Sequence, residues 1–122
     1  MILFIYSKCS TCKNALRFLE NNHIQFVPKE IVIEPPSVQQ LKDMLNFMEG
    51  NVKKLFNSYG QLYRELGLHK LLGKMPIADT LILLSQNGML VKRPFLLAKD
   101  FGLTGFNEID WTKKMLPKVN YT

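Results

Sequence analysis

The sequence predicts an α/β fold in which a β-α-β unit is followed by a block of helices and then by a β-β-α unit. An apolar, strand-like run over residues 2–6 stops at Ser7 and leads directly into an amphipathic helical pattern. Helical spacing with capping and turn residues then continues to about residue 87, after which two short apolar runs return. No internal repeat or low-complexity linker interrupts this order.

Residues 2–30 form the first predicted unit. The i, i+3, i+4, i+7 spacing of a helix with one buried face is present in Cys12, Ala15, Leu16 and Leu19. Asn21 and Asn22 end this helix, and the run from residue 24 to about residue 30 has the composition of a second strand. The first unit is therefore predicted as β-α-β.

The middle of the chain is predicted to be mostly helical, as an insertion over about residues 37–87. After Pro35-Pro36, Ser37 is suited to cap a helix, and Gln40 completes a capping-box pattern. Gly50 closes this helix, shorter helical patterns follow at 52–56 and 62–66, and Pro76 is placed to begin a further helix that stops at Asn87-Gly88.

The last third is predicted as two strands and a helix. The strands are expected at 89–92 and 94–98, a loop at 100–105, and a helix capped by Asn107 and ended by Pro117. This order is typical of a thioredoxin-like fold with a helical insertion and a mixed four-stranded sheet.

Length and composition limit the possible classes of protein. A chain of 122 residues with 47% hydrophobic content predicts one domain over residues 1–122. No leader pattern or long apolar run is present, which predicts a soluble, cytoplasmic protein without a membrane partner. The net charge of +6 is spread over pairs such as Lys92-Arg93 rather than basic arms, so direct nucleic-acid binding is not expected.

The candidate site is a CxxC motif that contains both cysteines of the chain, Cys9 and Cys12. A thiol at the first turn of a helix lies near unpaired backbone N–H groups and the positive end of the helix dipole, which favour the thiolate. Cys12 is one turn away and can attack an oxidised Cys9 to close a disulfide, although it also fits the buried face of the helix. His23 and His69 show no metal-ligand spacing with these cysteines, so no metal is predicted.

Polar residues around the motif are candidates for binding substrate. Lys8 and Lys13 flank the cysteines and could lower the pKa of Cys9, although exposed lysines most often only interact with solvent. Ser10 and Thr11 lie between the two thiols and are further candidates.

Several motifs are spread over nearly the whole chain: Tyr6-Ser7-Lys8-Cys9-Ser10-Thr11-Cys12-Lys13-Asn14, the Pro-Pro-Ser helix start, Tyr63-Arg64-Glu65-Leu66-Gly67-Leu68, Met75-Pro76, Arg93-Pro94, and Gly105-Phe106-Asn107-Glu108. Together they resemble the arsenate reductase / Spx family. The CxxC motif and Leu55-Phe56-Asn57-Ser58 resemble its Spx-like branch more closely than its arsenate reductase branch. The resemblance implies that Pro94 is a cis-proline that faces the cysteine and binds substrate, and that Arg93 stabilises a bound anion or the thiolate.

The sequence also departs from the arsenate reductase branch, in which the resemblance implies three arginines that hold the oxyanion. Only Arg93 matches one of them. Asn57 falls at the first position and Gly105-Phe106 at the third, with no arginine after Lys99. A single charge-assisted partner holds an oxyanion less tightly than three.

The function predicted from these residues is thiol–disulfide exchange, with Cys9 as nucleophile, Cys12 as resolving thiol and Arg93 as the stabilising cation. This chemistry needs no cofactor beyond a thiol donor such as glutathione, glutaredoxin or thioredoxin. Two alternatives stay open. One is an Spx-like redox-sensing regulator that binds the RNA polymerase alpha subunit, and the other is a thiol-dependent arsenate reductase.

Overall fold

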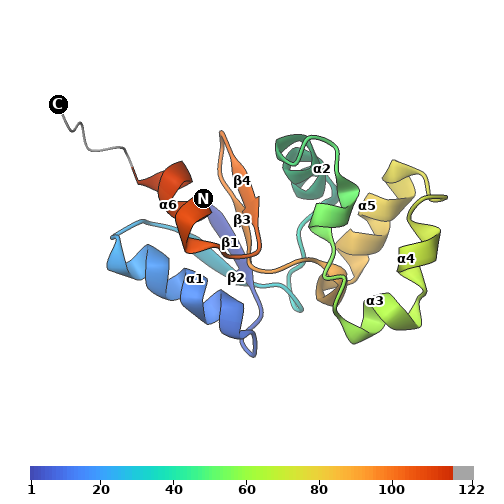
Figure 1. The fold of residues 1–122 in the computed structure, drawn as a ribbon, viewed down its shortest axis with the longest axis horizontal. Coiled ribbons are helices and arrows are strands. Elements are labelled where there is room, and N and C mark those ends of the chain that lie inside the picture. Colours follow the sequence, from blue (N-terminus) through green and yellow to red (C-terminus); the bar gives the residue numbers. More distant parts are fainter. Residues whose placement is uncertain (117–122) are drawn as a thin grey trace.

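The computed structural model describes residues 1–116, and these form a four-stranded sheet with helices on both faces (Figure 1). The strands are β1 (Ile2–Ile5), β2 (Val27–Glu30), β3 (Phe95–Leu97) and β4 (Gly102–Thr104). The α-helices are α1 (Ser10–Asn21), α2 (Val38–Phe47), α3 (Gln61–Glu65), α4 (Leu68–Leu71), α5 (Ile77–Gln86) and α6 (Glu108–Met115). Two short 3-10 helices are η1 (Val52–Leu55) and η2 (Gly88–Leu90).

The sheet is mixed, in the order β2-β1-β3-β4. Strand β1 runs parallel to β2 and antiparallel to β3, and β3 is antiparallel to β4. Parallel pairing of β1 and β2 requires a crossover, which α1 supplies. The mixed four-stranded sheet and the thioredoxin-like order predicted from the sequence are therefore confirmed.

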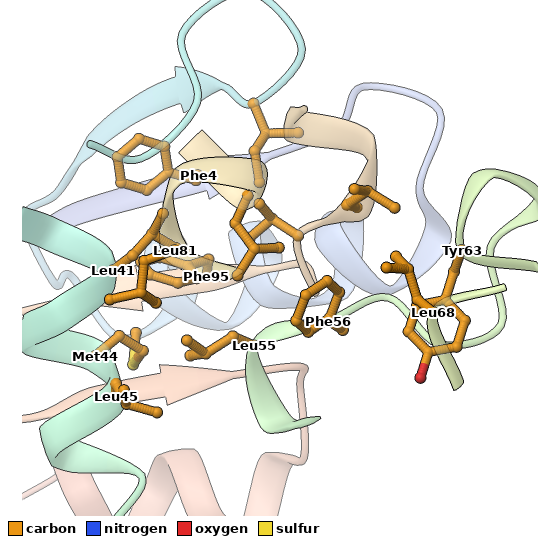
Figure 2. Packing of buried hydrophobic residues seen from close by; sticks show 14 of the residues in the cluster. Phe4, Leu41, Met44, Leu45, Leu55, Phe56, Tyr63, Leu68, Leu81 and Phe95 are labelled. Atoms are coloured by element: carbon orange, nitrogen blue, oxygen red, sulfur yellow. The ribbon is translucent and has the colours of Figure 1, made fainter. Parts of the chain in front are cut away.

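Alternating side chains of the central strands divide the core into two layers. Leu3 and Leu96 pack on the face covered by α1 and α6, where Trp111 is buried. Phe4 and Phe95 point to the opposite face, and their rings meet edge to face with centroids 5.5 Å apart. Figure 2 shows Phe4 and Phe95 packed with apolar side chains of the helical insertion, such as Leu41.

Local capping patterns explain where two of the helices begin. The Ser37 side chain accepts from the backbone N–H of Gln40, and the Gln40 side chain accepts from the backbone N–H of Ser37, which is the predicted capping box. Asn107 caps α6 by accepting from the backbone N–H of Asp110 at 3.1 Å. The predicted end of this helix at Pro117 lies outside the described residues.

Two predictions for the last third are wrong. Residues 89–92, expected as a strand, instead contain the end of η2 and a single β-bridge from Val91 to Phe56. This segment turns away from the sheet to meet the helical insertion, so it pairs at one position only. Residues 100–105, expected as a loop, contain β4, whose Gly102 lies against Met44 of α2. A Cβ at Gly102 would lie 2.4 Å from the Met44 sulfur, so the glycine permits close packing rather than marking a turn.

Within the described part of the chain, no helix combines the length and the apolar character needed to cross a membrane.

Candidate active site

Cys9 is the residue on which α1 begins. The chain leaves β1 at Ile5, turns through Tyr6, Ser7 and Lys8, and enters the helix with Cys9 in an extended conformation as the N-cap. The backbone N–H of Cys9 donates to the Tyr6 carbonyl oxygen at 3.0 Å, and that of Ser7 donates to the Glu30 carboxylate at 3.2 Å. These bonds fix the loop between the end of β1 and the start of the helix.

The sulfur of Cys9 takes the place that a serine or aspartate oxygen usually has at a helix N-cap. It accepts a hydrogen bond from the backbone N–H of Cys12 at 3.3 Å. Such a bond is stronger to a thiolate than to a thiol because the acceptor then carries the negative charge.

Cys12 differs from Cys9 in its exposure. It lies in the first turn of α1 with its side chain only 1% exposed, and its sulfur accepts from the backbone N–H of Tyr6 at 3.5 Å. Cys9 is partly exposed, and both residues are free thiols. The motif thus combines one thiol that solvent can reach with one that is covered by protein.

The two thiols have opposite pKa shifts. Burial alone would raise the pKa of Cys9, but it is outweighed by the Cys12 side-chain and backbone hydrogen bonds, the positive charge of Arg93 and the Thr11 backbone N–H, so the Cys9 pKa lies below its ordinary value of 9.0. Burial raises the pKa of Cys12 to about 12, and the neighbouring Cys9 adds to this shift. Of the two sulfurs, Cys9 is therefore the one that ionises at the lower pH.

Arg93 comes from the chain segment just before β3. Its guanidinium lies 5.0 Å from the centroid of the Tyr6 ring and donates to the Met89 carbonyl oxygen at 3.2 Å. The Arg93-Pro94 peptide bond is cis, as expected, and Pro94 is buried. That Pro94 faces the cysteine and binds substrate stays a prediction. The structure thus places the Arg93 charge where it acts on both cysteines.

A cavity of about 420 Å³, which we call the site cavity, extends from Arg93. Its lining includes Thr11, Asn57, Tyr59, Lys92, Arg93, Leu103, Thr104, Gly105, Phe106, Asn107, Asp110 and Trp111. The two positions at which the family resemblance implied further arginines, Asn57 and Gly105-Phe106, therefore do line the same cavity as Arg93. Their side chains bring no positive charge to it.

A short pairing between distant segments builds this cavity. The backbone N–H of Asn57 donates to the Leu90 carbonyl oxygen, and that of Lys92 donates to the Leu55 carbonyl oxygen, both at 2.8 Å. On the other side, the N–H of Gly105 donates to the Pro94 carbonyl oxygen at 2.8 Å. The helical insertion and the loop after β4 are thereby held against the segment that carries Arg93.

The structure separates the other residues predicted to bind substrate. Thr11 lines the site cavity, whereas Cys9, Cys12 and Pro94 do not. Lys8, Ser10 and Lys13 are exposed and are also not part of its lining. The two lysines are also not among the groups that lower the pKa of Cys9. Their role in binding substrate stays a prediction.

Lys92 is a cation of the site cavity that the sequence reasoning did not single out. In the sequence it is one member of a basic pair, which resembles ordinary surface charge. Its position directly before Arg93 was the available signal, but its entry into the cavity depends on the pairing with Leu55, which no local pattern reveals.

Cys9 and Cys12 are the only metal-binding side chains in this motif. Across residues 1–116, no three His, Cys, Asp or Glu side chains lie close enough together to hold a metal ion. The groups that this arrangement offers for chemistry are two unequal thiols beside an arginine.

Comparison with known proteins identifies relatives of this chain in sequence and in structure. Residues 4–114 match the model of the ArsC family. The chain is 35% identical to the uncharacterised protein YusI of Bacillus subtilis, over 88% of this chain and 92% of YusI. It is 26% identical to the global transcriptional regulator Spx of Enterococcus faecalis, over 97% of this chain and 87% of the regulator. A crystal structure of a putative ArsC family related protein from Bacteroides fragilis superposes with a TM-score of 0.86 at 38% identity, covering 92% of this chain and 94% of that chain.

Proposed function

This chain belongs to the ArsC family, and we propose that it performs thiol–disulfide exchange with Cys9 as the attacking thiolate and Cys12 as the resolving thiol. The observation that supports the proposal most directly is the position of the Cys9 sulfur. It caps α1 by accepting the Cys12 backbone N–H, and the positive charge of Arg93 acts on it. Cys12, one turn further on, is covered by protein and holds its proton.

The reaction proceeds in two exchange steps. In the first, the Cys9 thiolate attacks one sulfur of a disulfide, the disulfide bond breaks, and the departing thiolate takes a proton from water. In the second, Cys12 gives up its proton, attacks the Cys9 sulfur and displaces the second substrate thiolate. Two electrons have then passed from the pair of cysteines to the disulfide, and the protein holds a Cys9–Cys12 bond.

The environment of Cys12 gives the two steps their order. Part of what raises the pKa of Cys12 is its hydrogen bond to Cys9 and the negative charge on Cys9. Once Cys9 is in a mixed disulfide, that charge is gone, while the charge of Arg93 still favours ionisation of Cys12. Cys12 is thus activated by the reaction of Cys9.

The oxidised pair needs a thiol donor to return to its starting state. We propose that the protein works in the reducing cytoplasm and takes electrons from glutathione, a glutaredoxin or a thioredoxin.

Mass spectrometry of the intact protein after treatment with bis(2-hydroxyethyl) disulfide tests this assignment. The wild type should lose two hydrogen atoms and carry no adduct. Cys12→Ser should accumulate the mixed disulfide on Cys9, and Cys9→Ser should stay unmodified at neutral pH. An adduct on Cys12 in the Cys9→Ser variant, or two free thiols in treated wild type, would show that the roles are assigned wrongly.

A second candidate function uses the same two cysteines as a regulatory switch. It is favoured by the similarity to Spx, which extends over nearly all of this chain. In this case the Cys9–Cys12 bond would change binding to the RNA polymerase alpha subunit. A pull-down with that subunit, using reduced and oxidised protein, should recover the chain in a redox-dependent way, and no recovery in either state would remove this candidate.

Arsenate reduction is less well supported by the cavity. Arg93 is its only arginine, and Asn57 lies where the resemblance implies another. Thiol consumption that depends on arsenate and exceeds that of Cys9→Ser would overturn this view.

A further inference from the structure

A second hollow, of about 590 Å³, adjoins the site cavity. We call it the lysine groove, because Lys54, Lys92, Lys113 and Lys114 line it. It lies between the C-terminal end of α2, strand β4 and helix α6. Lys92 lines both hollows, together with Leu103 and Thr104 of β4 and Asp110 of α6. The groove is therefore continuous with the surface next to Arg93.

Positive charge dominates the lysine groove. The two acidic groups that line it are Glu49 and Asp110, against four lysines. Within residues 1–116 the structure has one ion pair, Lys29 with Glu34, and none of the groove residues takes part in it. The Lys114 ammonium lies 6.0 Å from the centroid of the Phe101 ring, a contact that leaves its charge uncompensated.

The fold gathers these lysines from three distant parts of the chain. Lys54 belongs to η1, Lys92 lies just before β3, and the other two belong to α6. Lys92 is held at its backbone by the hydrogen bond to Leu55. Its side chain passes so close to Gly105 that a Cβ there would lie 3.0 Å from the Lys92 Cε. The lysine that joins the two hollows is thus positioned by backbone contacts rather than by chance on a flexible surface.

We propose that the lysine groove and the site cavity together bind an acidic segment of a partner protein that carries a disulfide. The Cys9 thiolate attacks one sulfur of that disulfide, the disulfide bond breaks, and the other sulfur leaves as a thiolate. The reaction at Cys9 rests on the proposed function, whereas the binding of the acidic segment does not. The two adjoining hollows run along β4 from α6 to Arg93, which suits an extended chain better than a compact anion.

The mixture of charges also favours a peptide over a nucleic acid. Glu49 and Asp110 would repel a continuous row of phosphates. An acidic peptide carries its charges only at intervals. It also presents backbone N–H groups, which can donate hydrogen bonds to those two carboxylates.

Fluorescence anisotropy with cysteine-free probes tests the binding separately from the chemistry. The Cys9→Ser protein is titrated into a fluorescein-labelled peptide of alternating glutamate and serine, and into a matched peptide with glutamine in place of glutamate. The acidic peptide should bind more tightly, and its affinity should fall as salt is added. Equal affinity for the two peptides would overturn the proposal. Tighter binding of a labelled oligothymidine of equal charge would also overturn it, in favour of a nucleic acid.

Matched lysine variants locate the binding surface. Lys113→Gln/Lys114→Gln should weaken binding of the acidic peptide roughly 2- to 25-fold, since each exposed charge pair contributes roughly a factor of 1.4 to 5. Lys70→Gln/Lys74→Gln removes the same charge near α4, on the far side of the molecule from α6 (Figure 1), and should leave binding within twofold. An equal loss of affinity in both double variants would mean that net charge alone explains the binding, and it would overturn the proposal.

Thermal unfolding of the groove variant completes the control. Lys113 and Lys114 lie in the last turn of α6, where positive charge also interacts favourably with the helix dipole. Lys113→Gln/Lys114→Gln should therefore melt slightly below wild type. Weakened peptide binding at a temperature where both proteins are fully folded supports the proposal, and unchanged binding there overturns it. If the acidic peptide binds as expected but disulfide-treated wild type keeps two free thiols and Cys12→Ser forms no mixed disulfide, the redox function fails and the groove assignment stands.

Discussion

Alkylation with iodoacetamide should modify the two cysteines at very different rates, although they are three residues apart. Only the thiolate reacts, so the rate follows the fraction of each sulfur that is ionised. Cys9 has a pKa below 9.0 and is partly exposed, whereas burial raises the pKa of Cys12 to about 12.

The size of the difference follows from these values. At pH 7 a thiol with a pKa of about 12 is ionised in about one molecule in 100,000, which is about a thousandfold less than a thiol at the ordinary value of 9.0. Because the pKa of Cys9 lies below 9.0, its excess of thiolate over Cys12 is greater still. The exposed fraction of 1% for Cys12 adds a steric barrier to the reagent. We therefore expect Cys9 to react more than about 1,000-fold faster.

The assay is quenched alkylation of the native, reduced protein, followed by peptide mass spectrometry that resolves the two positions. Unfolded protein in denaturant supplies the control, in which both sulfurs should react at similar rates. Rates within tenfold of each other in the native protein would refute the burial and hydrogen-bonding argument for this motif.

Three further predictions concern charge, packing and capping. Arg93→Met should move the pH midpoint of Cys9 alkylation upward and slow the reaction at neutral pH, because a positive charge that favours the thiolate is lost. Gly88→Ala should lower the free energy of unfolding by about 3 kcal/mol or more, measured by urea denaturation, since its Cβ would lie 1.9 Å from a backbone carbonyl oxygen. Gly73→Ala, where a Cβ meets nothing within 4 Å, should stay within about 1 kcal/mol. Ser37→Ala should cost about 0.5–2 kcal/mol in the same assay, because α2 loses its capping box.

Each of these outcomes has a counterpart that would contradict it. Arg93→Lys keeps the charge and should retain part of the lowered midpoint, so an effect equal to that of Arg93→Met would point to lost packing instead. If Gly88→Ala and Gly73→Ala changed the free energy of unfolding equally, this would contradict the close approach of the backbone at Gly88. For Ser37, the control is Ser58→Ala in an exposed turn, and an equal cost there would remove capping as the cause.

Local sequence patterns predicted correctly those elements whose structure depends on residues close together in the chain. The run at residues 2–5 is a buried strand, and the capping residues Ser37 and Asn107 begin helices because their partners lie three residues away. The position of Cys9 at the start of α1 follows from the same kind of signal. In each case the interaction that fixes the element is contained within a few residues of sequence.

The sequence did not predict the structure of segments whose conformation depends on residues far away in the chain. Residues 89–92 have strand composition, but Val91 pairs with Phe56 instead of entering the sheet. Gly102 looks like a turn residue, yet it pairs with Leu97 of β3, and Met44 of α2 packs against it. Lys92 enters the site cavity for the same reason, since its partner, Leu55, is far away in the chain.

The cap on α1 also affects how readily the two cysteines are oxidised. In the reduced protein the Cys9 sulfur holds the backbone N–H of Cys12, and a sulfur in a disulfide is a weaker, uncharged acceptor. The cap therefore stabilises the reduced form of the protein relative to the disulfide form. A cap of about 1 kcal/mol corresponds to a reduction potential about 20 mV more oxidising than that of an uncapped pair. The first turn of a helix thereby sets, in part, the direction in which electrons flow.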